Sequence, residues 1–171
     1  MDNAASSRLK TTELPSAVEV TALVVMRLAL GFWIGAAVLF IITSIAEQKF
    51  PAFDSMLRDQ LATIRFPFYY AFGISCCTAA IAAGVICRNL SRHLQIAMLL
   101  TTLAAVVFAL DYWFVYRLLQ ELIIPAGSPR TEQFEKLHTW SRNVNSVHLL
   151  LVLIAAVQAG LPVLPVKHHS G

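Results

Sequence analysis

The chain has 171 residues, of which 57% are hydrophobic and only 13% are charged, and its net charge is +3 at neutral pH. Soluble domains carry about 25% charged residues, so a water-soluble fold of this size could not cover so much apolar surface. The basic residues lie in short clusters beside apolar runs, which is typical of membrane proteins and argues against nucleic-acid binding.

Four apolar runs reach the length of about 20 residues that a helix needs to cross a hydrocarbon core of about 30 Å. The sequence therefore predicts an all-α fold: a four-transmembrane-helix bundle over residues 20–166, with a disordered N-terminal tail at 1–19 and a C-terminal tail at 167–171. The first run is too long and begins too late for a cleaved signal peptide, so we expect it to be a retained helix. The predicted helices are residues 20–46, 66–87, 94–118 and 144–166.

Two of the connections between these helices have helical periodicity of their own. In the third connection, Arg130–Arg142 places Phe134 and Leu137 on one side. We therefore predict short amphipathic helices on the membrane surface in the first and third connections. In the first connection, apolar residues recur at helical spacing opposite charged ones: Phe53, Met56, Leu57, Leu61 and Ile64.

Small residues on the first two helices predict close helix packing. Gly31 and Gly35 form a GxxxG pattern, and Ala80 and Gly84 form the looser small-xxx-small pattern. Such patterns fit contacts within one chain or between two, so the partners we consider are the lipid bilayer and, through Gly31 and Gly35, a second copy of this chain. No disulfide is expected among the three cysteines: Cys76, Cys77 and Cys87.

Polar side chains within the apolar runs are costly, and they are therefore the informative positions. Arg27 lies about 10 Å into the first helix, where its long side chain can reach back to the interface. Asp111 lies one to two turns before the end of the third helix. Since the second helix runs antiparallel to the third, we expect Tyr69 and Tyr70 close to Asp111.

The fourth helix carries the richest polar face, within a sector of about 120°. One interpretation is a polar pocket at one membrane face, in which this stripe converges with Asp111, Tyr69 and Tyr70. The other is interhelical hydrogen bonding that only fixes the register of the bundle. The stripe steps by three or four residues: His138, Ser141, Arg142, Asn145 and His148.

Two histidines of the stripe raise the question of a metal or haem. His138 and His148 are separated by about 15 Å along one helix, so they cannot share a metal ion. Either one alone could bind haem or copper, so a membrane redox protein is an alternative. The sequence contains no Gly-rich phosphate loop, HExxH motif or visible catalytic triad. The leading prediction is therefore a non-enzymatic membrane protein without a cofactor, either an accessory protein or one that handles a small solute or metal.

Two short motifs point to a known family. Arg65-Phe-Pro-Phe-Tyr-Tyr70, followed by Gly73, begins the second helix, and Phe134-Glu-Lys-Leu-His138, followed by Ser141 and Asn145, begins the fourth. With Gly31, Gly35 and Phe40 on the first helix, this order resembles the transmembrane protein 205-like family, also called domain-of-unknown-function family 4149. The resemblance covers about residues 23–164.

The resemblance implies four helices and no assigned reaction. In the third helix the family's polar residues near the helix end are matched only if Asp111 or Arg117 stands in for them. The family is also faintly similar to four-helix copper-resistance and haem-dependent oxidase membrane proteins, a likeness of fold that does not fix function. The positions that the resemblance marks are Phe66, Pro67, Tyr69, Tyr70, His138, Ser141 and Asn145.

The basic residues also bear on orientation. Arg88 and Arg92 crowd the short link between the second and third helices, which has no acidic residue. Such a dense basic link favours the cytoplasmic side of a membrane. With four helices, this prediction also places both termini in the cytoplasm.

Overall fold

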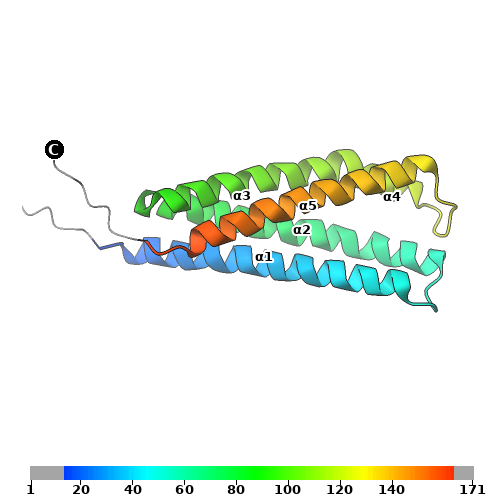
Figure 1. Ribbon diagram of the computed structural model, residues 1–171, viewed down its shortest axis with the longest axis horizontal. Helices are drawn as coiled ribbons and strands as arrows, with labels where there is room; N and C mark the ends of the chain where they lie inside the picture. The colour runs from blue at the N-terminus through cyan, green and yellow to red at the C-terminus, as the bar shows by residue number, and fades with distance from the viewer. Residues whose placement is uncertain (1–13, 164–171) are drawn as a thin grey trace, which may run out of the picture.

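The computed structural model describes residues 14–163, which form four long helical spans packed as a bundle (Figure 1). Each span is long and apolar enough to cross a membrane. The predicted all-α bundle of four transmembrane helices is therefore confirmed. The elements are α1 (Ala17–Lys49), α2 (Ser55–Cys87), a 3-10 turn (Arg88–Leu90), α3 (Arg92–Asp111), a π-helical turn (Tyr112–Tyr116), α4 (Arg117–Leu122) and α5 (Glu132–Gly160).

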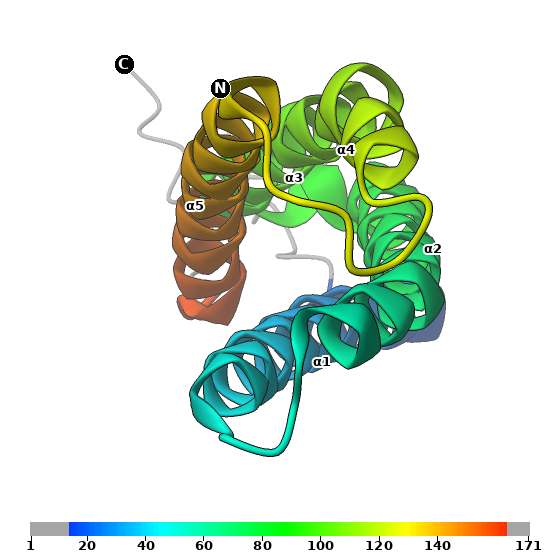
Figure 2. The ribbon, with the colours of Figure 1, turned by 90° about the vertical axis from the view of Figure 1, so that its right-hand side faces the viewer.

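The third span consists of α3, the π-helical turn and α4, which together run without a break from Arg92 to Leu122. α5 crosses the bundle obliquely. Its last turn lies beside the beginning of α1, whereas its first turns lie beside α4 (Figures 1 and 2). We call the end that holds the start of α1 and the end of α5 the terminal end, and the opposite end the loop end.

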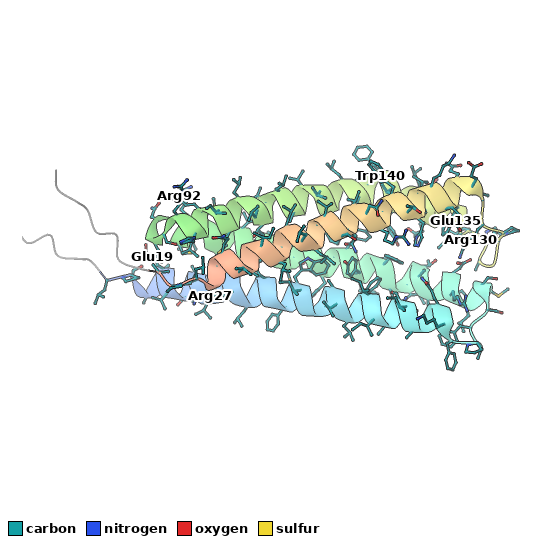
Figure 3. All side chains as sticks on the ribbon, viewed as in Figure 1. Glu19, Arg27, Arg92, Arg130, Glu135 and Trp140 are labelled. Carbon is teal, nitrogen blue, oxygen red and sulfur yellow. The ribbon has the colours of Figure 1, made fainter. Side chains whose placement is uncertain are left out.

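Labelled charged side chains lie near the two ends of the bundle (Figure 3). Glu19, Arg27 and Arg92 lie at the terminal end, and Arg130 and Glu135 lie at the loop end. Between them the outer surface carries many exposed apolar side chains. This distribution is suited to a bilayer, because the bilayer core accommodates apolar groups and its two interfaces accommodate charged ones.

α1 begins three residues before the predicted residue 20, because Ser16 and Glu19 form a capping box. The Ser16 hydroxyl accepts from the Glu19 backbone N–H at 3.3 Å, and the Glu19 carboxylate accepts from the Ser16 N–H at 2.8 Å. This S-x-x-E pattern satisfies two N–H groups that an uncapped helix leaves unpaired. The rest of the predicted N-terminal tail lies mostly outside the described residues.

The prediction of two separate surface helices in the connections is wrong. Both segments are the first turns of longer helices, because α2 already begins at Ser55 and α5 at Glu132. The second helix was predicted to begin at residue 66, and Pro67 lacks an N–H and clashes with the preceding turn. α2 continues through Pro67, and contacts on its first turns fix that extension: Asp59 binds the α4–α5 connection, and Arg65 pairs with Glu47 of α1.

α5 ends at Gly160, before the predicted residue 166, and Pro162 follows. Arg27 contacts this end from α1. Its Nε donates to the Ala159 carbonyl at 2.7 Å, and its guanidinium also donates to the Leu161 carbonyl at 3.4 Å. A cation at a helix C-terminus satisfies unpaired carbonyls and complements the helix dipole. Arg27 thus joins α1 to α5 at the terminal end. The predicted C-terminal tail lies outside the described residues.

The connection between α4 and α5 crosses the loop end and touches α2 (Figure 2). Gly127 turns the chain there with a φ of 87°, a conformation that favours glycine. Its N–H donates to Asp59 of α2 at 2.9 Å, and Arg130 forms an ion pair with the same carboxylate. Because Asp59 is 2% exposed, this pair is partly shielded from water.

We expect Asp59→Asn to lower the free energy of unfolding by about 1–2 kcal/mol, since it removes a partly buried hydrogen bond between charged groups while it keeps an acceptor for Gly127. Unfolding by denaturant in mild detergent measures this loss. The matched control is Glu132→Gln, which breaks the Lys136–Glu132 pair, whose side chains are 74% and 83% exposed. That change should cost less than about 0.5 kcal/mol. Equal effects of the two substitutions would contradict a structural role for Asp59.

Candidate functional site

A buried carboxylate lies at the centre of the candidate site. Asp111, the last residue of α3, is 2% exposed. Its Oδ2 accepts from the Tyr70 hydroxyl at 2.6 Å and from the Ser141 hydroxyl at 3.0 Å. We call Asp111, Tyr70 and Ser141 the Asp111 cluster. It joins α3 to α2 and α5. Asp111 lies close to Tyr70, as the sequence predicted.

The other carboxylate oxygen of Asp111, Oδ1, is buried and has no hydrogen-bond partner. Within residues 14–163, no lysine, arginine or histidine forms an ion pair with Asp111. Buried polar atoms in proteins are nearly always paired, so an unpaired carboxylate oxygen marks a position where a further group can bind.

The π-helical turn that follows Asp111 changes the face that the next residues present. The Arg117 N–H donates to the Tyr112 carbonyl five residues earlier, so this turn is wider than the about 3.6 residues of a regular helix. Tyr116 stacks on Tyr112, with ring centroids 5.6 Å apart, and packs against Tyr70 at 4.9 Å. The Tyr116 hydroxyl is buried and, like Oδ1 of Asp111, has no partner. Such widened turns are frequent at functional sites.

A second polar pair lies next to the Asp111 cluster. The Tyr69 hydroxyl donates to Oδ1 of Asn145 at 3.0 Å and thereby joins α2 to α5. The ring of Tyr69 stacks on Phe40 of α1, with centroids 4.3 Å apart. Sequence reasoning placed Tyr69 and Asn145 in the same region, and the structure brings them together.

His148 belongs to a third group, on the terminal side of the other two. One ring nitrogen, Nε2, accepts from the Trp33 indole at 2.8 Å, and the other, Nδ1, lies 2.9 Å from the Ala104 carbonyl. A neutral imidazole satisfies both contacts, with Nδ1–H as donor to the carbonyl. His148 is fully buried and stacks on Phe108 at 4.4 Å. The structure thus uses both nitrogens to join α5 to α1 and α3.

Gly73 makes this aromatic layer fit against α2. A Cβ atom at position 73 would lie 2.5 Å from Cη2 of Trp33 and 2.7 Å from Cε1 of Phe108. A Cβ atom does not approach non-bonded carbon atoms that closely, so only glycine admits both rings at their present positions. Sequence reasoning did not identify Trp33 as the hydrogen-bond partner of His148. An indole N–H in the middle of an apolar run was the available signal, because a buried indole donor usually finds an acceptor.

Two predicted members of the polar pocket lie outside it. His138 and Arg142 are exposed on α5, and His138 stacks on Phe134 at 5.7 Å rather than facing Asp111. The prediction that all these residues converge in one pocket is therefore wrong for His138 and Arg142. Its remaining members form three separate groups: Asp111 with Tyr70 and Ser141, Tyr69 with Asn145, and His148 with Trp33.

The predicted packing residues behave in two ways. Ala80 and Gly84 are buried, and a Cβ at position 84 would lie 3.0 Å from Cγ of Met98, so this pair brings α2 close to α3. Gly31 and Gly35 face outward, with nothing within 4 Å of an added Cβ. They do not pack within the described chain, and their contact with a second copy stays a prediction. Cys76, Cys77 and Cys87 are free thiols on α2.

In the part of the chain that the structure describes, no three His, Cys, Asp or Glu side chains come together in a way that could hold a metal ion. His148 could bind haem or a metal only after losing one of its two hydrogen bonds, to Trp33 or to the Ala104 carbonyl. His138 is exposed and lies away from the other polar groups. The geometry therefore gives the predicted haem or copper alternative no preformed site at either histidine.

No family model matches the chain, and neither a curated protein nor a solved structure gives a significant match. A functional proposal must therefore rest on the geometry of the site.

Proposed function

We propose that this chain is a non-enzymatic membrane protein that binds a small cation, or a small solute with a cationic group, at Asp111. The observation that carries this proposal is Oδ1 of Asp111, which is buried without a partner while Oδ2 accepts two hydrogen bonds. An uncompensated charge inside a membrane protein costs several kcal/mol. A cation at Oδ1 would offset that cost.

The distribution of unpaired polar atoms supports access from the loop end. Four buried atoms besides Oδ1 of Asp111 lack partners, and none lies in the terminal half of the described bundle. Groups of this kind are usually satisfied by water when the site is polar. A solute would therefore travel a polar route from the loop end as far as Asp111. The four atoms are Ser44 Oγ, Arg58 Nε, Arg65 Nε and the Tyr116 hydroxyl.

Cation binding should appear as thermal stabilisation of the detergent-purified protein. Sodium, lithium or methylammonium chloride would be titrated against N-methyl-D-glucamine chloride at constant ionic strength. At a concentration 100 times its dissociation constant, a bound cation stabilises the folded state by about 2.7 kcal/mol. That corresponds to about 5–11 °C in the unfolding midpoint of a chain of this size. Asp111→Asn keeps the shape of the side chain and should abolish the shift.

Glu121→Gln is the matched control, because Glu121 is an exposed carboxylate on α4. Its variant should respond to the cation as the wild type does. If none of the three cations stabilises the wild type, or if Asp111→Asn responds equally, Asp111 does not bind a cation. The Asp111 cluster would then act only to fix the helix register, which is the second candidate function.

That second candidate rests on a separate observation. The Trp33–His148 and Tyr69–Asn145 pairs are each mutually satisfied and join different helices. Interhelical hydrogen bonds of this kind hold transmembrane bundles in register. These pairs would remain structural even if Asp111 binds a solute, so the two candidate functions divide the polar residues between them.

We also propose membership in the transmembrane protein 205-like family. The marked positions Tyr70 and Ser141 both bond to Asp111. This contact supports Asp111, rather than Arg117, as the counterpart of the family's polar residues on the third helix. Arg117 is exposed and packs over Trp113, 5.1 Å from its ring centroid.

The proposed topology keeps both termini in the cytoplasm. The start of α1 and the end of α5 lie at the same end of the bundle as the basic link with Arg88 and Arg92 (Figure 1). Under the positive-inside rule, this link supports a cytoplasmic terminal end. The loop end, with the proposed route to Asp111, would then face the opposite side of the membrane. A second copy at Gly31 and Gly35 would be compatible with this topology.

A further inference from the structure

A groove of about 310 Å³ lies between α1 and α2. Its rim opens on the outer surface, because Phe68 and Phe72 are 73% and 46% exposed. We call it the α1–α2 groove. Its walls come from two stripes at helical spacing, one on each helix: Trp33, Ala36, Phe40 and Thr43 on α1, and Arg65, Phe68, Tyr69 and Phe72 on α2.

The α1–α2 groove has a polar end and an apolar end. Arg65 lies at its loop end, whereas Trp33 and Phe72 lie about 10–15 Å deeper along the helices. The guanidinium lies 5.3 Å from the ring centroid of Phe40 and pairs with Glu47. Its Nε is buried and has no partner. A donor at the interface above an apolar channel matches the order of groups in a phospholipid.

The polar end of the groove carries one positive and one negative side chain, Arg65 and Glu47. It can therefore discriminate between lipid headgroups that differ in charge. Glu47 uses Oε1 to accept from Arg65, and its side chain is 23% exposed. Both members of the pair stay partly exposed, the Arg65 side chain at 26%, so a headgroup can reach the guanidinium and the carboxylate. A zwitterionic headgroup with a phosphate and a primary ammonium complements both charges, whereas an anionic headgroup complements only Arg65.

We propose that the α1–α2 groove binds one phosphatidylethanolamine molecule. Its phosphate would accept from the guanidinium of Arg65, whose side chain is 26% exposed, its ammonium would contact Glu47, and the upper part of one acyl chain would lie along Ala36, Phe68 and Phe72. This lipid site does not require a cation at Asp111, although Arg65 belongs both to the groove and to the proposed polar route. The apolar wall of the groove supplies the rest of the contact.

The test uses delipidated protein in detergent, with phosphatidylethanolamine and phosphatidylglycerol of identical acyl chains as probes. Native mass spectrometry counts bound lipid, and thermal unfolding measures stabilisation. We expect one phosphatidylethanolamine per chain, held about tenfold more tightly than phosphatidylglycerol. Inorganic phosphate at the same concentration should give no stabilisation. Equal binding of the two lipids, or stabilisation by phosphate alone, would overturn the proposal.

Ala36→Leu fills the α1–α2 groove without touching the ion pair, and it should weaken phosphatidylethanolamine binding by about tenfold or more. Ala82→Leu is the matched control. It makes the same change in another apolar groove between α1 and α2, at the terminal end, and should leave binding unchanged. Equal retention of the lipid by both variants would refute the site.

A second variant keeps the test decisive if Ala36→Leu does not fold. Glu47→Gln leaves Arg65 in place but removes the partner of the ammonium, so the preference for phosphatidylethanolamine over phosphatidylglycerol should disappear. If Glu47→Gln keeps the wild-type preference, the assigned headgroup contacts are wrong.

Discussion

Replacing Gly73 by alanine should destabilise the protein by about 3 kcal/mol, within the range that overpacking of a filled core costs. The added Cβ would lie 2.5 Å from the Trp33 ring and 2.7 Å from the Phe108 ring. Neither ring can move freely, because Trp33 bonds to His148 and Phe108 stacks on the same histidine. For a chain of this size the unfolding midpoint should fall by about 6–12 °C, measured by thermal unfolding in detergent.

Gly35→Ala is the matched control for Gly73→Ala. It makes the same chemical change on α1, where nothing lies within 4 Å of the added Cβ. Alanine favours a helix over glycine by about 0.5–1 kcal/mol, so this variant should be unchanged or slightly more stable. A Gly73→Ala protein as stable as Gly35→Ala would show that the aromatic layer is packed less tightly than the structure describes.

The helices themselves could be predicted because hydropathy and length decide which segments cross a membrane. Their ends were predicted less well, because local caps set some of them, as Ser16 and Glu19 do for α1, and contacts between distant segments support others. The first turns of α2 look like a surface helix in sequence, with apolar residues on one side and charges on the other. In the fold the charges meet partners: Asp59 binds Gly127 and Arg130. Such contacts support the turns of α2 that precede Pro67, and the Asp54 N-cap is the local signal for their start that sequence reasoning did not use.

The candidate site was predicted in part, for a geometric reason. Antiparallel neighbours place residues at matching depths, so Tyr70 near Asp111 follows from counting residues along two helices. The polar sector of α5 also follows from periodicity. Periodicity does not predict which side of that sector faces the interior of the bundle. At about 100° per residue, Ser141, Asn145 and His148 lie on one side of that sector, and His138 and Arg142 on the other.

Packing decides which side of the α5 sector faces inward. The oblique course of α5 turns the Ser141 and His148 side toward Asp111 and Trp33. The π-helical turn adds a second effect of this kind, because it shifts the face on which Tyr116 appears by widening one turn. The unpaired Tyr116 hydroxyl was therefore beyond the reach of a periodicity that assumes a regular helix.

His148→Ala should lower the free energy of unfolding by about 3–5 kcal/mol, similar to the truncation of other large buried rings. The substitution opens a cavity among Trp33, Phe108 and Ala104, and it leaves the Trp33 indole N–H buried without an acceptor. Chemical unfolding in mild detergent measures the loss. If His148 were instead held in place only to bind a ligand, its removal would leave the stability of the unliganded protein nearly unchanged.

A double-mutant cycle with Trp33→Phe separates the hydrogen bond from the cavity. Trp33→Phe keeps an aromatic ring against Gly73 but removes the indole donor, so it should cost about 1–3 kcal/mol. Hydrogen bonds between transmembrane helices contribute about 0.6 kcal/mol on average and at most about 1.7 kcal/mol. We expect a coupling energy near the upper value, because this bond is fully buried and both rings also share packing with Phe108. Strictly additive effects would mean that His148 stabilises the bundle by its volume alone, and that the contact between α1 and α5 does not depend on the hydrogen bond.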